Sequence, residues 1–153
     1  MSVAVTFKFD ASDVRANTEE TLQLITGSTE GVADVMKDVM DRVEDVMEGV
    51  GRDVSRDLKK ELSVPVVRVG SKVIRSKPGQ YPRADTRQLL NSVHYVVYRA
   101  GRDITNLVVE TNTSYDIYVN ATRPFQALTE AKWHGVIDQR IQFSELSTAQ
   151  FTS

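Results

Sequence analysis

Two histidines, His94 and His134, are the side chains of this chain best suited to acid–base or metal chemistry near neutral pH. Neither belongs to a His-x-x-x-His or His-Glu-x-x-His spacing, in which one helix face presents two metal ligands. Ser92 and His94 share one face of a predicted strand, but no Gly-x-Ser-x-Gly elbow surrounds the serine. We therefore expect no enzyme and no metal site. The alternative, a small hydrolase that uses His94, predicts turnover that the substitution His94→Ala abolishes.

Other catalytic and cofactor-binding patterns are also missing from the sequence. The chain has no cysteine, which excludes disulfides, thiolate catalysis and cysteine-ligated metals. It has no Gly-x-x-x-x-Gly-Lys-Ser/Thr loop for nucleotide phosphates. Four acids, Asp41, Glu44, Asp45 and Glu48, lie close together, but the exposed face of a helix ordinarily carries such charges. A divalent-ion site there is the alternative, and we expect no cofactor.

One segment, between Ser63 and Leu90, is strongly basic. Its six bases, against the single acid Asp85, are Arg68, Lys72, Arg75, Lys77, Arg83 and Arg87. A basic loop of this kind fits an acidic protein surface or DNA, and the alternative is an ordinary solvated loop. Only Tyr81 supplies an aromatic ring for stacking on bases, so specific nucleic-acid binding is not expected. A DNA-binding module stays open as an alternative, and it predicts binding that weakens steeply with salt.

Length and composition fit one domain with a single core. Of the 153 residues, 41% are hydrophobic and 26% charged, as in ordinary globular proteins. The net charge of −2 gives no global electrostatic reason to bind nucleic acid or an anionic membrane. No apolar run approaches the roughly 18 residues of a membrane span, and the N-terminus lacks the apolar core of a signal peptide. We expect a protein made in a reducing cytoplasm, neither secreted by a signal peptide nor inserted in a membrane.

The longest regular pattern runs from Thr29 to Leu62, where apolar residues recur every three or four positions. They are Val32, Met36, Val39, Val43, Val46, Val50, Val54, Leu58 and Leu62. This pattern predicts an amphipathic helix roughly 50 Å long, at about 1.5 Å per residue. Gly49 and Gly51 mark where such a helix could kink or break. A helix of this length exceeds one small core, so we expect it to project beyond a sheet or to pack against a neighbouring chain.

Shorter patterns on either side of the long helix predict a sheet. Residues 2–9, 93–98, 107–110 and 115–119 have the alternation or the composition of strands. The last three follow one another with short links and predict an antiparallel meander, which the first strand joins as an edge. Before the long helix, Leu22, Leu24 and Ile25 predict one side of a short helix that ends at Gly27-Ser28.

The fold class that follows is α+β. We predict a mainly antiparallel sheet of about four strands, packed by the helix at about 29–62 and by a C-terminal helix at about 125–139. A single domain would span 1–141 with an extended basic loop at 63–85, and residues 142–153 would form a C-terminal tail or arm. The side chains expected in the core are Leu89, Val93, Tyr115, Phe125 and Trp133.

Several short motifs occur in a fixed order after the long helix. Pro78-Gly79-Gln80-Tyr81-Pro82 forms a Pro-Gly-x-x-Pro loop, and Asp85-Thr86 with Leu89 and Ser92 follows it. Two more motifs follow downstream. They are the segment Tyr115-Asp116-Ile117-Tyr118-Val119 and the Arg123-Pro124-Phe125 segment at the entry to the last helix. Over roughly residues 2–137 this order resembles the tail-completion, or head–tail joining, family of tailed bacteriophages, a family of neck proteins.

The resemblance implies a structural virion protein that forms a ring, usually a hexamer of the chain, at the neck or at the top of the tail. Its partners would be the head–tail connector or stopper protein and the tail tube or terminator protein, with no membrane involved. It would be made in the host bacterial cytoplasm and found in the virion. The alternative within this class is a tail terminator, which caps the tail tube and stops its growth.

The resemblance and the residue chemistry together give a candidate interface. Pro78, Gly79 and Pro82 restrict or redirect the loop, which lowers the cost of ordering it against a neighbour. Tyr and Arg dominate interface hot spots. The candidate interface residues are Arg68, Lys72, Arg75, Lys77, Pro78, Gly79, Tyr81, Pro82, Arg83 and Arg123. The residues expected to serve as structural parts of the motifs are Asp85, Thr86, Leu89, Ser92, Tyr115, Tyr118, Pro124 and Phe125.

Overall fold

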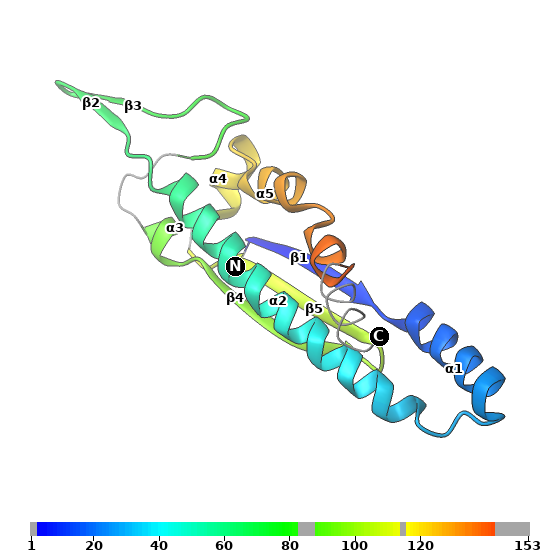
Figure 1. The fold of residues 1–153 in the computed structure, drawn as a ribbon. Coiled ribbons are helices and arrows are strands. Elements are labelled where there is room, and N and C mark those ends of the chain that lie inside the picture. The colour runs from blue at the N-terminus through cyan, green and yellow to red at the C-terminus, as the bar shows by residue number, and fades with distance from the viewer. Residues whose placement is uncertain (1–2, 83–87, 114–115, 143–153) are drawn as a thin grey trace. The chain divides into compact units, whose positions relative to one another are not determined.

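The structure, a computed structural model, describes residues 3–82, 88–113 and 116–142 of the chain (Figure 1). These residues fall into two compact units. The first unit takes its residues from 1–6, 51–96 and 108–134, and the second unit takes its residues from 7–50, 97–107 and 135–153. The predicted α+β class is confirmed, because a long helix and a C-terminal helix combine with an antiparallel sheet.

The main sheet has three strands: β1 (Val3–Asp10), β4 (His94–Gly101) and β5 (Ile104–Thr111), in the order β1–β5–β4. Every second residue of β5, beginning at Thr105, is buried, and so are Val3, Val5 and Phe7 in β1. This is the two-residue period expected of strands with one face turned to a core. The edge position predicted for β1 is confirmed.

The fourth strand predicted at 115–119 is wrong, because Asp116–Thr122 forms the helix α4. The buried Asp116 carboxylate accepts hydrogen bonds from the Thr111 hydroxyl at 3.1 Å and from the Thr113 backbone N–H at 3.3 Å. Asp116 is also the acid in the first turn of α4, where a negative charge interacts favourably with the helix dipole. Five alternating residues are a weaker signal than this local contact.

The long helix is confirmed as α2 (Val32–Leu62), which has 31 residues. It passes through Gly49 and Gly51 without a break in its helical hydrogen bonding. Glycine inside a helix costs about 1 kcal/mol relative to alanine, an amount that the burial of the apolar face readily offsets. The predicted place of a kink is therefore regular helix.

The buried face of α2 differs from the predicted one at two places. Met40 and Met47 are 3% and 0% exposed, whereas the adjacent Val39 and Val46 are only half-buried. Adjacent positions on a helix are about 100° apart and can flank the same face, so periodicity alone does not choose between them. The unbranched methionine side chains reach the core at both places.

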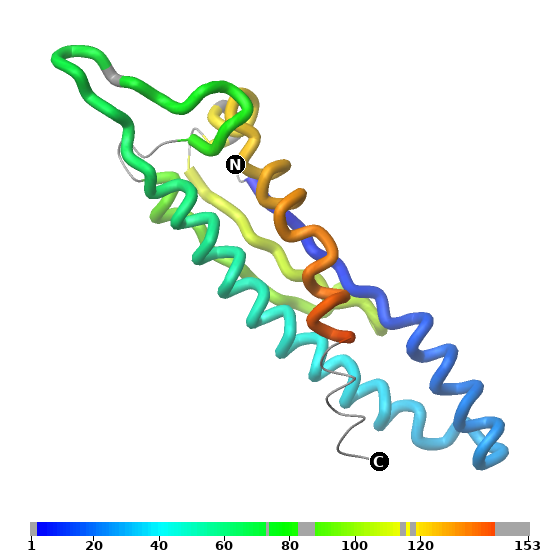
Figure 2. Tube along the Cα trace, turned by 45° about the horizontal axis from the view of Figure 1, so that its top comes forward, coloured from blue at the N-terminus to red at the C-terminus, as the bar shows by residue number. Residues whose placement is uncertain are grey.

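In the second unit, the helix α1 (Ser12–Thr26) packs on the beginning of α2 (Figures 1 and 2). Leu22 contacts the core cluster that contains Met36, but Leu24 and Ile25 are 80% and 75% exposed. The expectation that all three line one buried face is wrong. Position 24 lies about 200° around the helix axis from position 22, and Ile25 is exposed in the last turn of α1.

In the second unit, an ion pair joins α1 to the turn between β4 and β5. The Arg15 guanidinium donates two hydrogen bonds to Oδ1 and one to Oδ2 of Asp103, at 2.8 to 3.0 Å. The Asp103 carbonyl also accepts the Ala11 backbone N–H at 2.7 Å. This bidentate geometry lowers the pKa of Asp103, chiefly through the hydrogen bonds from Arg15.

The last helix is shorter than predicted. The helix α5 (Phe125–Trp133) ends at His134-Gly135, where Gly135 has φ 76°, and helical residues resume at 136–142. Because a left-handed residue cannot continue an α-helix, the predicted helix at 125–139 is two pieces. Trp133 is half-buried, and its indole N–H donates to the Asp57 carboxylate at 3.3 Å.

Candidate functional site

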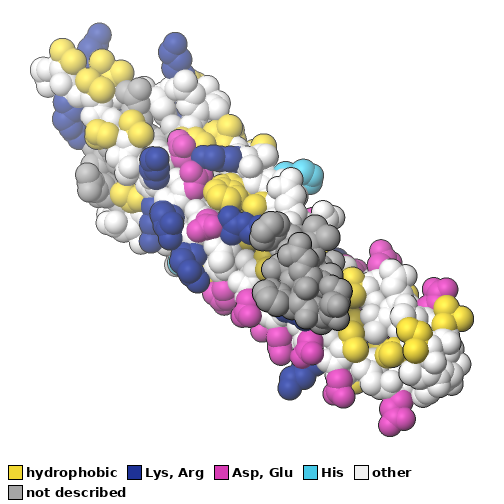
Figure 3. All heavy atoms as spheres, viewed as in Figure 1, with side chains coloured by type: hydrophobic (Ala, Val, Ile, Leu, Met, Phe, Trp, Pro, Cys, Tyr) yellow, Lys and Arg dark blue, Asp and Glu magenta, His cyan; other side chains and the backbone are white. Residues whose placement is uncertain are grey.

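The basic segment that follows α2 forms a small hairpin in the first unit, with strands β2 (Val67–Val69) and β3 (Lys72–Ile74). The two strands are antiparallel, with Val69 paired to Lys72, and Gly70 at φ 61° lies in the turn. Arg68 and Lys72 are exposed beside Val67, Val69 and Ile74, which are also exposed. Figure 3 shows basic and hydrophobic side chains together on this hairpin. Such a mixture is typical of protein interfaces.

The hairpin leads into the Pro-Gly-x-x-Pro loop, which is fastened to the Arg-Pro-Phe segment. Arg123 donates from Nε to the Ser76 hydroxyl at 2.9 Å and from Nη2 to the Ser76 carbonyl at 2.6 Å. The Gly79 backbone N–H donates to the Thr122 carbonyl at 2.9 Å. Gly79 has φ 88°, a conformation that favours glycine. Two motifs that lie far apart in the sequence therefore meet in the first unit.

The side chains of this loop divide into anchored and exposed ones. Tyr81 is half-buried, its hydroxyl lies 3.2 Å from the Thr129 hydroxyl, and burial raises its pKa. Pro82 is buried, whereas Lys77 and Pro78 are exposed. The loop thus presents its first residues to solvent and holds its last ones against α5.

The other predicted residues are buried, belong to a helix or precede one, or lie outside the described residues. Leu89 and Phe125 are buried, and Pro124 precedes the first residue of α5. Tyr118 belongs to α4. The expected roles of Arg83, Asp85, Thr86 and Tyr115 fall outside the described residues. Sequence reasoning missed the polar partners Ser76, Thr122 and Thr129, for which no local pattern exists.

Arg123→Ala is expected to release the Pro-Gly-x-x-Pro loop. Hydrogen bonds from a charged group are worth about 1.5–3 kcal/mol, and about 1.4 kcal/mol corresponds to a tenfold change, so amide exchange at Gly79 should accelerate by about tenfold or more. Hydrogen–deuterium exchange of the peptide covering 75–82 measures this change. The exposed Lys77→Ala serves as the control, and equal protection in wild type and Arg123→Ala would refute the anchor.

His94 does not form a hydrolytic pair with Ser92. The Ser92 hydroxyl donates to the Leu89 carbonyl at 2.8 Å. His94 Nδ1 lies 2.8 Å from the Ser92 carbonyl oxygen, and Nε2 lies 2.7 Å from Glu110 Oε1. Both ring nitrogens thus face acceptors, an arrangement that the imidazolium satisfies fully because both of its nitrogens are donors. The pKa of His94 is accordingly raised, first by the Ser92 carbonyl and then by Glu110.

The raised pKa of His94 predicts that stability falls as the pH rises. The contribution of the charged imidazolium is fully present below the ordinary histidine pKa of about 6.5 and is lost as the pH passes through the higher folded-state value. Urea unfolding at pH 5.5 and 8.5 should show this loss in the wild type. Glu110→Gln should reduce it, and a wild-type stability that is unchanged or greater at pH 8.5 would contradict the assignment.

The described residues hold neither a metal-binding cluster nor a membrane-spanning helix. Within 3–82, 88–113 and 116–142, no three His, Asp or Glu side chains are grouped so as to hold a metal ion. In the same ranges, no helix has the length and apolar character needed to cross a bilayer. Comparison of the chain with protein-family models, with curated proteins and with solved structures gave no match.

Proposed function

We propose that this chain is a structural virion protein of a tailed bacteriophage, which forms a ring at the neck or the top of the tail and acts in tail completion and head–tail joining. The proposal starts from the ordered motifs, from Pro78 to Phe125, that resemble the tail-completion family. The ring would contact the connector or stopper protein on one side and the tail tube or terminator on the other.

The observation that carries the proposal is the contact between two of these motifs. The Pro-Gly-x-x-Pro loop and the Arg-Pro-Phe segment are joined by the hydrogen bonds between Gly79 and Thr122 and between Arg123 and Ser76. Motifs that resemble one family and also form one local structure are better evidence than isolated matches, since each fixes the conformation of the other. The fastened loop supports the exposed hairpin that would meet a neighbour.

The partner-binding part would be the hairpin formed by β2 and β3. Its exposed Val67, Val69 and Ile74 would bury apolar surface, and its exposed basic side chains would face acidic groups on the neighbour. Because Arg123 and Tyr81 are bonded within the first unit, we assign them to holding the loop rather than to contacting a partner.

A phage mutant that lacks the chain tests the proposal. We expect filled heads and tails of normal length that fail to join. Overlong tails would instead identify a tail terminator, and normal infectious particles would overturn both assignments. Complementation with the chain in which Val69 and Ile74 are replaced by Asp, against a control with Val96→Asp on the exposed part of β4, tests whether the hairpin is the joining surface.

A further inference from the structure

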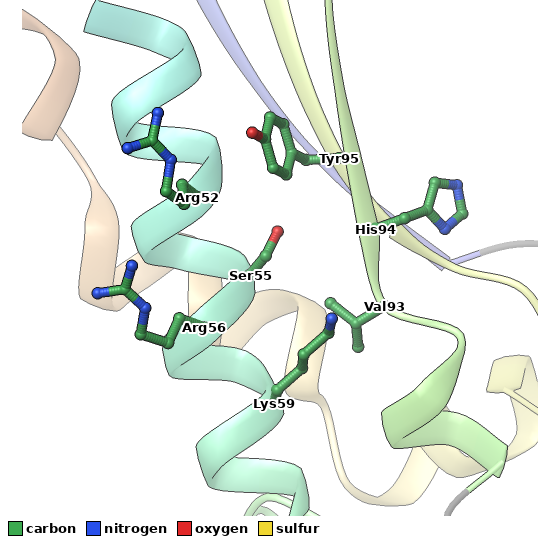
Figure 4. A pocket seen from close by; sticks show the side chains of 7 residues that line it. All are labelled: Arg52, Ser55, Arg56, Lys59, Val93, His94 and Tyr95. Atoms are coloured by element: carbon green, nitrogen blue, oxygen red, sulfur yellow. The ribbon is translucent and has the colours of Figure 1, made fainter.

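A basic groove lies in the first unit between α2 and the beginning of β4. It has a volume of about 500 Å³. Arg52, Ser55 and Lys59 line it from α2, and Val93 and Tyr95 line it from the other side. In Figure 4, Ser55 and Lys59 point from the helix toward β4, and Tyr95 points back toward the helix. Arg52 and Lys59 are exposed and have no ion-pair partner among the residues that the structure describes.

The groove contains a buried hydroxyl that needs a partner. Ser55 is 7% exposed, and its Oγ has no hydrogen-bond partner among the described atoms. A buried polar group left unpaired is unfavourable, so the free Ser55 hydroxyl marks a place that a ligand can complete. The groove offers donors that suit an anion: the Arg52 guanidinium, the Lys59 ammonium and the hydroxyls of Ser55 and Tyr95. These groups match the oxygens of a carboxylate.

The second unit carries carboxylates of the matching kind on α2. Asp34, Asp38, Asp45 and Glu48 are exposed, at helical spacings of four, seven and three, and have no ion-pair partner among the described residues. Asp41 and Glu44, in contrast, are both paired with Arg99. Figure 3 shows a row of acidic side chains on this part of the molecule. We call the four residues Asp34, Asp38, Asp45 and Glu48 the acidic stripe.

We propose that the basic groove of one copy of the chain binds the acidic stripe of a second copy. The inference rests on the proposed ring, since it names a contact through which copies join. Groove and stripe are different surfaces, so each copy offers one of each and the contact is heterologous, the type that closes into rings. Stripe carboxylates bind Arg52 and Lys59 and give the Ser55 hydroxyl its missing acceptor.

Charge reversal in two places tests the contact. The variants Arg52→Glu/Lys59→Glu and Asp45→Lys/Glu48→Lys should each dissociate the oligomer, weakening assembly by about 100-fold or more, because like charges then face each other. An equimolar mixture of the two variants should reassemble, since the reversed groove of one fits the reversed stripe of the other. Sedimentation velocity over a range of protein concentrations measures the assembly of each variant and of the mixture. Assembly of the wild type should weaken as the salt concentration rises.

Matched controls separate the contact from general effects of charge and folding. Lys60→Glu, next to Lys59 on α2 but outside the groove, should assemble like the wild type. Ser55→Ala should weaken assembly without lowering the thermal midpoint of the dissociated chain, because it removes an unpaired hydroxyl.

Three outcomes overturn the inference: a wild type that stays monomeric, double variants that assemble normally, or a mixture that fails to reassemble. Loss of DNA binding in Arg52→Glu/Lys59→Glu with assembly intact would also overturn it and would assign the groove to nucleic acid. These results test only the contact between copies. Whether the chain lies at the neck of a virion is tested separately, by electron microscopy of the particle.

Discussion

Met47→Ala is expected to lower the free energy of unfolding by about 2–5 kcal/mol. Met47 lies on the buried face of α2 and is 0% exposed, so truncation to alanine leaves a cavity that the packed surroundings close only in part. The measurement is equilibrium unfolding in urea, monitored by far-ultraviolet circular dichroism. A shift of the midpoint with an unchanged slope would report lost stability rather than a changed unfolded state.

Val46→Ala is the matched control for this substitution. Val46 is the residue that the sequence periodicity places in the core, yet it is only half-buried in the structure. It should therefore lose clearly less stability than Met47→Ala, even though valine and methionine are both apolar. If Val46→Ala proved the more damaging of the two, the register of the buried face of α2 would be wrong.

Phe125→Ala is expected to cost about 3–5 kcal/mol of stability. Phe125 is 2% exposed at the start of α5. The next residue, Gln126, donates its backbone N–H to Asn120 at 3.0 Å and its side-chain amide to the Ala4 carbonyl at 2.6 Å. Gln126 thus ties α5 to α4 and to β1 in the first unit, directly beside the buried Phe125.

Leu128→Ala gives the comparison within the same helix. Leu128 is half-buried, so Leu128→Ala should lower the free energy of unfolding by less than Phe125→Ala does. Tryptophan fluorescence of Trp133, the one tryptophan of the chain, follows unfolding of the first unit in both variants. A Phe125→Ala protein as stable as the wild type would show that this position is not part of the core.

The sequence predicted the elements whose signals are long and local. In α2 the apolar residues recur every three or four positions over 31 residues, and β1 alternates over its whole length, so both were recognisable without tertiary information. At 115–119 the alternation was short, and Asp116–Thr122 forms a helix, with the Asp116 carboxylate hydrogen-bonded to Thr111 and Thr113. On α2 the helical period allowed either Val39 and Val46 or Met40 and Met47 to face the core. Only the packing of the folded chain selects the methionines.

The candidate site was predictable only in composition. The cluster of bases between Ser63 and Leu90 was visible, but each strand of its hairpin has only three residues, too few for a clear alternation. The bonds of Arg123 to Ser76 join residues 47 positions apart, which no local pattern encodes. The basic groove was missed for the same reason, because its two sides come from α2 and β4.

Electron microscopy of particles labelled with antibodies against the chain tests the central claim most directly. The particles would be purified from a culture that produces the protein, and the labelled position would be compared with the head, the neck and the tail tip. The proposed function predicts a ring of label density at the junction of head and tail. Particles that lack the chain altogether, as judged by mass spectrometry of the purified virions, would contradict it.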